Sequence, residues 1–210
     1  ILVGMAWPAT KTVIDMKNTA NPDITIKATG YQWKWGYDYL QGEGQGIRFV
    51  SMLSTPLEQI QGRAAKGEHY LLEVDNPLVV PIGKRIRMLM TADDVIHSWW
   101  VPAFGVKQDA IPGFIRDAWF LAEKEGIYRG NCAELCGRDH GFMPIEVHVV
   151  SQQAYSEWVA SRQSAAQAAS AAGSGVLAAS ASRADVQNVA VAADAANAPG
   201  VAVSAAPAAH

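Results

Sequence analysis

Apolar and polar side chains alternate in the first half of the chain. Residues 24–29 read Ile-Thr-Ile-Lys-Ala-Thr, the period-two signature of a half-buried β-strand. Further short apolar runs, separated by Gly, Pro, Asn and Asp, predict strands at Leu71–Val74, Leu78–Val80, Arg85–Leu89, Asp117–Leu121 and Pro144–Val150. Short strands at this spacing, without βαβ alternation or an internal repeat, predict an all-β sandwich or barrel.

The hydrophobic period changes after residue 150. The segment Ser151–Gln163 places Tyr155, Trp158 and Val159 on one helical stripe, and Ser151 is a suitable N-cap. We therefore expect one amphipathic helix to close a domain that spans residues 23–163.

The two ends of the chain differ from this domain. Residues 164–210 are nearly half Ala and contain no aromatic residue, so they cannot bury enough surface to offset the entropy of ordering. We expect a tail or linker there, with a loose Ala-rich helix as the alternative. Residues 1–22 form a lead-in whose apolar start, Ile1–Trp7, is too short to span a membrane. It fits either the end of a lost transmembrane helix or a buried strand.

Composition narrows the class of protein. A length of 210 residues indicates one domain, with or without a tail, and 50% hydrophobic residues suffice for a core. The formal net charge of -3 gives no indication of nucleic-acid binding. The only two cysteines, Cys132 and Cys136, are too few for a disulfide framework.

These cysteines begin the most informative motif, C-x3-C-x3-H-x2-M, which continues through His140 and Met143. Glycines and a proline interrupt it, so we expect a ligand loop between two strands rather than a helix. Thiolate, imidazole and thioether together favour a soft, redox-active metal, and copper fits best.

The number of thiolates indicates how many ions would bind. A mononuclear blue copper site uses two His, one Cys and a weak axial Met. One additional thiolate suggests two copper ions bridged by two sulfurs, and His97, at the end of an apolar strand, is the best candidate for the missing imidazole.

Plainer interpretations of the same residues stay open. Cys132 and Cys136 could form a disulfide or hold structural zinc, although zinc rarely takes a thioether. His97 could simply pack in the core. We expect His148, which shares a strand face with Glu146, to be a solvated surface residue.

With these residues in view, the chain closely resembles cytochrome c oxidase subunit II over roughly residues 30–150. The Cys132–Met143 loop resembles that family's binuclear copper (CuA) loop. The other similar segments are His97–Gly113, Leu71–Asn76, and the aromatic stretch Gln32–Trp35 with Tyr37–Tyr39.

The resemblance implies a complete set of copper ligands. Cys132 and Cys136 would bridge both ions as thiolates. His97 and the Met143 thioether would complete the first ion, and His140 and the backbone carbonyl of Glu134 would complete the second.

The resemblance also implies roles outside the copper ligands. The Glu134 carboxylate would face a magnesium or manganese ion shared with oxidase subunit I, with Asp109 supporting it. Trp33 would be the entry point for electrons. The carboxylates that would help to dock a basic cytochrome c are Asp38, Asp75 and Asp94.

The sequence departs from the family at a few positions. Lys34 stands between Trp33 and Trp35 where an aromatic residue is usual, and Tyr31 replaces a common His, so the docking patch should be less acidic and less flat. Trp33 and Trp35 flank Lys34 in a predicted strand, so both rings should point to the same face. The family's two membrane helices are absent, save for the segment at Ile1.

The resemblance predicts a cupredoxin-like Greek-key sandwich in the bacterial periplasm, or the equivalent intermembrane space. It would accept electrons from cytochrome c and pass them to haem in subunit I, where dioxygen is reduced to water and protons are pumped. Three alternatives stay open. A quinol oxidase subunit II shares the fold but lacks the copper ligands, a nitrous oxide reductase carries a similar loop, and a free-standing copper carrier would need only this domain.

Overall fold

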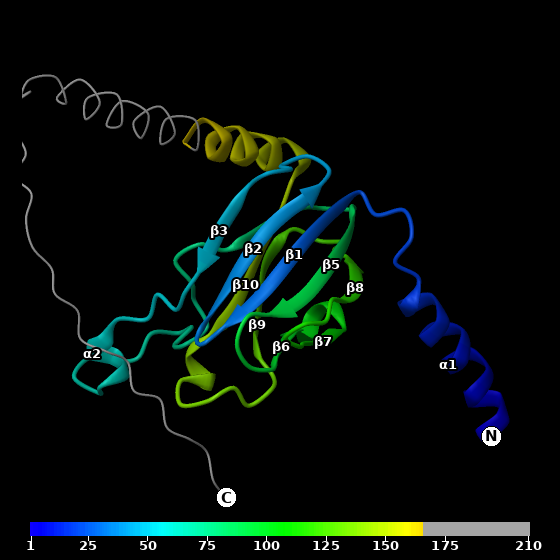
Figure 1. Ribbon diagram of the computed structural model, residues 1–210, viewed down its shortest axis with the longest axis horizontal. Coiled ribbons are helices and arrows are strands. Elements are labelled where there is room, and N and C mark those ends of the chain that lie inside the picture. The colour runs from blue at the N-terminus through cyan, green and yellow to red at the C-terminus, as the bar shows by residue number, and fades with distance from the viewer. Residues whose placement is uncertain (166–210) are drawn as a thin grey trace, which may run out of the picture. The chain divides into compact units, whose positions relative to one another are not determined.

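The structure is a computed structural model that describes residues 1–165, and its main body is a sandwich of two five-stranded sheets (Figure 1). The strands of the first sheet, in spatial order, are β3 (Arg48–Ser51), β2 (Lys34–Gln41), β1 (Ile24–Tyr31), β5 (Arg85–Ala92) and β8 (Arg116–Leu121). Those of the second sheet are β4 (Leu78–Pro81), β10 (Pro144–Val150), β9 (Gly126–Cys132), β6 (His97–Val101) and β7 (Val106–Ala110). The predicted all-β fold class is confirmed.

Strand alternation supplies the core between the sheets. In β5, which reads Arg-Ile-Arg-Met-Leu-Met-Thr-Ala, every second residue is buried, and β1 and β2 follow the same rule on their inner face. The inner side chains of both sheets form one apolar cluster in which Trp35 and Trp99 are fully buried. This cluster fixes the register, because a one-residue slip would turn every inner side chain outward.

Two parallel pairings connect segments that are distant in sequence. β1 pairs in parallel with β5, and β10 pairs in parallel with β4, whereas the other strand pairs are antiparallel. These crossovers give the Greek-key arrangement of a cupredoxin-like sandwich. The antiparallel pairing of β6 with β9, which sets Trp99 opposite Cys132, brings His97 beside the end of β9.

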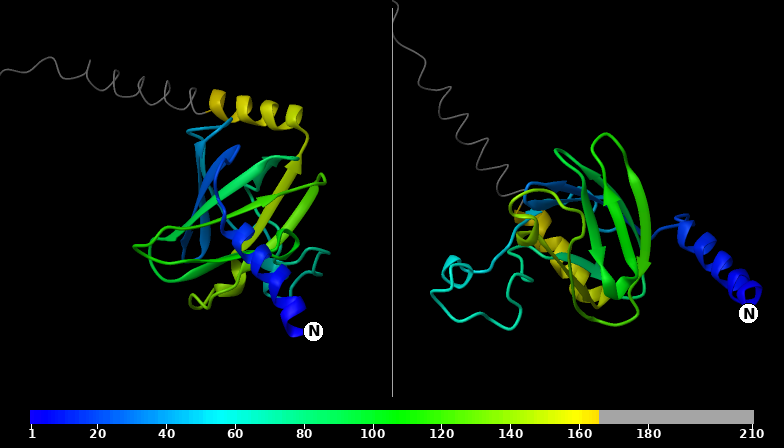
Figure 2. Two further views of the ribbon diagram at one scale, coloured as in Figure 1. Left: turned by 90° about the vertical axis from the view of Figure 1, so that its right-hand side faces the viewer. Right: turned by 90° about the horizontal axis from the view of Figure 1, so that it is seen from below.

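The predicted closing helix is present at residues 152–165 and packs against one end of the sandwich (Figure 2). The Ser151 hydroxyl accepts a hydrogen bond of 3.2 Å from the Ala154 amide, which confirms the predicted N-cap. Tyr155 is fully buried and donates to the Glu43 carbonyl at 2.6 Å, and the Trp158 ring packs 5.4 Å from that of Tyr39. Beyond residue 165, the predicted tail lies outside the described residues.

The segment before the sandwich is helical. Helix α1 (Leu2–Lys17) has no buried residue, so the buried-strand interpretation of the N-terminal residues is wrong. Among the described residues, no helix is both long and apolar enough to cross a membrane. Thr19 donates a hydrogen bond of 2.7 Å to Asp117 on β8, and Arg87 on β5 pairs with the same carboxylate at 2.8 Å.

The strand predicted at Leu71–Val74 is not formed. Residues 54–73 instead make an excursion that contains the short helix α2 (Leu57–Ile60), and Leu71 adopts a positive φ of 62°. Only Val74 forms a bridge, with Leu53, at the base of this excursion. The apolar run therefore lies at the foot of a loop and not in a sheet.

Candidate metal centre

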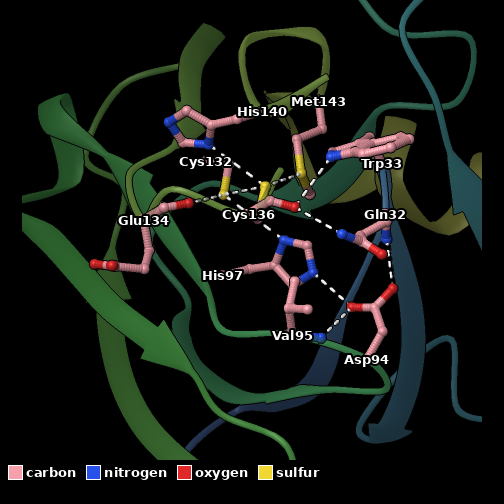
Figure 3. Close-up of polar contacts among 10 residues, drawn as sticks. All are labelled: Gln32, Trp33, Asp94, Val95, His97, Cys132, Glu134, Cys136, His140 and Met143. Carbon is pink, nitrogen blue, oxygen red and sulfur yellow. Dashed lines mark hydrogen bonds and ion pairs between the residues drawn. The ribbon is translucent and has the colours of Figure 1, made fainter. Parts of the chain in front are cut away.

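The predicted ligand motif lies in a loop at one end of the second sheet. Strand β9 ends at Cys132 and β10 begins at Pro144, and the loop between them contains only a short 3-10 turn, His140–Phe142. The expectation of a ligand loop between two strands is confirmed. Two strands thus fix both ends of the loop, while β6 brings His97 to it from the side (Figure 3).

Six predicted donor groups converge on this loop. The sulfurs of Cys132 and Cys136 lie 3.9 Å apart, and both cysteines are free thiols in this structure. Around Cys132 lie the His97 Nδ1 at 3.9 Å and the Glu134 carbonyl at 3.4 Å. Around Cys136 lie the His140 Nδ1 at 3.4 Å and the Met143 Sδ at 3.6 Å.

The chemistry of this donor set fits copper. Both cysteines, Met143 and His97 are buried, so soft sulfur and imidazole donors face one another in a space shielded from water. His97, Cys132 and Cys136 alone place three ligand atoms within 4.8 Å of one another. A thioether beside two thiols and two imidazoles matches a copper centre better than a zinc site.

The two thiols influence each other's ionisation. Burial opposes ionisation of Cys132, but the hydrogen bond with His97, followed by that with the Glu134 backbone, lowers the pKa of this thiol to about 7. Burial, followed by the charge of Cys132, raises the pKa of Cys136 to about 12. Two adjacent buried thiolates therefore repel each other, and a shared cation is the group that would stabilise both.

His97 packs between Trp35 and Gly30. It is the first residue of β6 and is 0% exposed, and the Trp35 ring meets it edge-on with centroids 6.0 Å apart. The other neighbour is Gly30 on β1, where a Cβ atom would lie only 2.7 Å from the His97 Cδ2. Glycine at position 30 therefore makes room for the imidazole.

The second ring nitrogen of His97 faces a carboxylate. His97 Nε2 lies 2.8 Å from Asp94 Oδ1. Burial disfavours the charged imidazole, while hydrogen bonds with Cys132 and Asp94 raise the pKa of His97 overall. The sequence-based interpretation did not connect Asp94 with His97, although a carboxylate three residues before a histidine ligand is a signal for such a contact.

Trp33 lies against the metal-binding loop. Its Nε1 donates to the Cys136 carbonyl at 3.2 Å, and the Gln32 side chain donates to the same oxygen at 2.9 Å. Trp33 is partly buried in the turn before β2, whereas Trp35 lies within β2 and is fully buried. The prediction that both tryptophans share one strand face is therefore wrong, because the strand begins only at Lys34.

The remaining predicted site residues lie outside the donor set. The Glu134 side chain is exposed, and Asp109 lies on β7 opposite Ser98. Asp38 forms ion pairs with Lys27 at 2.7 Å and Arg48 at 3.1 Å. Asp75 accepts hydrogen bonds of 2.7 Å from the amides of Met52 and Asn76. Their assignments to a magnesium or manganese site and to docking stay predictions.

One expectation about the second sheet is wrong. The expectation of a solvated face fails at Glu146, which is only 7% exposed, whereas the His148 side chain is 32% exposed. The His148 Nε2 lies 2.6 Å from the Glu146 carboxylate, and Arg129 stands opposite on β9. The alternation predicted the strand correctly but could not reveal the surroundings of its outer face.

Comparison with known proteins agrees with this site. Residues 24–150 match the family model described as cytochrome c oxidase subunit II, periplasmic domain. Cytochrome c oxidase subunit 2 of Cereibacter sphaeroides is 42% identical over 172 residues, covering 76% of this chain and 56% of that protein. The corresponding protein of Cyanidium caldarium is 43% identical over 162 residues, covering 76% of this chain and 62% of its own length.

A solved structure extends the likeness to three dimensions. The crystal structure of the periplasmic domain of subunit II of cytochrome oxidase from Bradyrhizobium japonicum superposes with a TM-score of 0.61 at 42% identity. The match covers 70% of this chain and 97% of that domain. The chain thus spans nearly all of an isolated domain, but less than two thirds of the length of the two full-length relatives.

Proposed function

Because the chain belongs to the family of the cytochrome c oxidase subunit II periplasmic domain, we propose that it is the electron-entry domain of a respiratory terminal oxidase. In this proposal, the Cys132–Met143 loop and His97 would hold a binuclear copper centre, whose chemistry would be to accept single electrons from a cytochrome c. The electrons continue to haem in a membrane-embedded subunit I, where dioxygen is reduced to water.

The observation that carries the proposal is the convergence of two buried thiols with two imidazoles, a thioether and a backbone carbonyl. Cys132 and Cys136 would bridge two copper ions, since each sulfur lies within 4 Å of the other and of an imidazole nitrogen. The remaining ligands would be His97, His140, Met143 and the Glu134 carbonyl. When bound, the copper pair supplies a one-electron carrier.

The surrounding residues would limit how far the ligands move. His97 is wedged between Gly30 and Trp35, and the loop is fixed by a strand at each end. Rigid ligands change position little when the charge of the centre changes, which favours fast electron transfer. The sandwich therefore acts as a frame for the donor set.

Trp33 is the proposed point of electron entry. Its indole is partly exposed and donates to the Cys136 carbonyl, so it lies between solvent and a residue that would contribute a bridging sulfur.

Where electrons would leave toward subunit I, we propose that the exposed Glu134 carboxylate and Asp109 support a magnesium or manganese ion at the contact with that subunit. Asp38 and Asp75 stay as proposed docking residues for cytochrome c.

Metal analysis and spectroscopy of the copper-reconstituted chain test this function. We expect two copper ions per chain, and one unpaired electron shared by both nuclei in electron paramagnetic resonance of the oxidised form. One bound zinc ion, or the spectrum of a mononuclear copper site, would refute the proposal.

A further inference from the structure

The Asp94 carboxylate is engaged in three hydrogen bonds within the domain. Its Oδ1 accepts from the Val95 amide at 2.6 Å and lies 2.8 Å from the His97 Nε2. Its Oδ2 accepts from the Gln32 amide at 2.7 Å. Figure 3 shows the carboxylate between the His97 ring and Gln32.

The two ring nitrogens of His97 face different partners. Nδ1 faces the Cys132 sulfur at 3.9 Å, and Nε2 faces Asp94 on the opposite side of the ring. His97 is fully buried, and the Asp94 carboxylate is the polar group that faces its Nε2. A carboxylate in this position selects the tautomer that leaves Nδ1 free, and it fixes the orientation of the ring.

The third contact extends the network to the turn that carries Trp33. Gln32 immediately precedes Trp33, and its side chain donates to the Cys136 carbonyl at 2.9 Å. One end of Gln32 is thus held by Asp94 and the other by the metal-binding loop. Asp94 therefore connects the β1–β2 turn with a ligand on β6.

We infer that Asp94 is a positioning residue that orients His97 toward the copper centre and holds the Trp33 turn. This inference rests on the proposed function. An ionised carboxylate offers about four acceptor sites, and three hydrogen bonds already converge on this one.

The experiment uses the full chain, reconstituted with copper and without any donor. Asp94→Ala should weaken copper binding by about 10- to 100-fold, the usual cost of losing such a partner. It should also alter the visible absorption of the centre and raise its reduction potential, because a negative charge that favours the oxidised form is lost. Asp94→Asn should fall between, since its amide oxygen can still accept from Nε2. The matched control is Asp93→Asn, because Asp93 is the adjacent exposed carboxylate, and this variant should equal wild type.

A second measurement does not depend on copper. In the metal-free chain, nuclear magnetic resonance should detect a slowly exchanging proton on the His97 Nε2, and this signal should be lost in Asp94→Ala and kept in Asp93→Asn. The positioning role is overturned if both Asp94 variants match wild type in copper affinity, absorption and potential and only slow reduction by the donor at low salt. A wild-type chain that binds no copper pair would instead refute the proposed function, and the two failures are therefore distinguishable.

Discussion

Replacing Trp33 with Gln removes the proposed entry point for electrons while leaving every proposed copper ligand in place. The substitution deletes the hydrogen bond from Nε1 to the Cys136 carbonyl, which contributes about 0.5–1.5 kcal/mol. The carbonyl keeps its bond from the Gln32 side chain, so no buried acceptor is left without a partner. Adding the partial loss of apolar contact, we expect a decrease of about 1–2 kcal/mol in the free energy of unfolding.

The matched comparison is Trp35, two residues along the chain. It is fully buried against His97, and truncating such a residue to Ala typically costs about 3–5 kcal/mol. Trp35→Phe retains most of the volume and should reduce stability while electron entry continues. The two substitutions should therefore have different effects: the change at Trp33 should lower the rate of reduction, and the change at Trp35 should lower stability.

Denaturant unfolding, the visible copper spectrum and stopped-flow reduction by cytochrome c measure these effects independently. For Trp33→Gln we expect a folded domain with a modestly lower unfolding midpoint, an unchanged copper spectrum and a large decrease in the rate of reduction by cytochrome c. An unfolded Trp33→Gln domain, or one that is reduced at the wild-type rate, would show that Trp33 is not the entry point.

Three further outcomes are expected. Substituting Ser for Cys132 or Cys136 should abolish the binuclear spectrum, because a single thiolate cannot bridge two coppers in the same geometry; an unchanged spectrum contradicts the ligand assignment. Glu134→Ala should retain copper, whose proposed ligand there is the backbone carbonyl, but disturb a manganese signal in the assembled oxidase; loss of the copper would identify the carboxylate as the ligand. Asp117→Asn tests a pH effect, because the hydrogen bond from Thr19 is the largest cause that lowers the pKa of Asp117. Because its folded-state pKa lies below the unfolded value of about 3.9, the ionised Asp117 stabilises the folded protein at neutral pH. This stabilisation is lost as the pH falls through the folded pKa. Chemical unfolding should show a gap between wild type and Asp117→Asn at pH 7 that narrows below about pH 4; a constant gap would contradict it.

Local sequence was sufficient to predict the ligand loop and much of the sandwich. Cys132, Cys136, His140 and Met143 are within a short segment, so their spacing and chemistry indicated a common site. The alternation in residues 24–29 and the final strand before residue 151 also predicted strands that the structure contains. These features depend on neighbours in the chain, which a single sequence displays directly.

Features that depend on distant partners were predicted less well. The apolar run at Leu71–Val74 matches a strand in composition, but no neighbouring strand pairs with it beyond one bridge. The burial of Glu146 depends on its three-dimensional surroundings, with Arg129 on the adjacent strand, and alternation along one strand carries no information about them. Likewise, the contact of Asp94 with Gln32 joins residues 62 positions apart.

The close fit of Gly30 against the His97 ring bears on protein engineering. Transplanting the Cys132–Met143 loop onto another β-sandwich would transfer four side-chain ligands but not the imidazole of His97. A recipient scaffold would also need a histidine at the equivalent strand end and a residue without a side chain on the facing strand, because even a methyl group there would overlap the ring. A graft that copies only the contiguous loop should therefore fail, and adding the His97 and Gly30 equivalents together is the smallest change expected to restore the complete donor set.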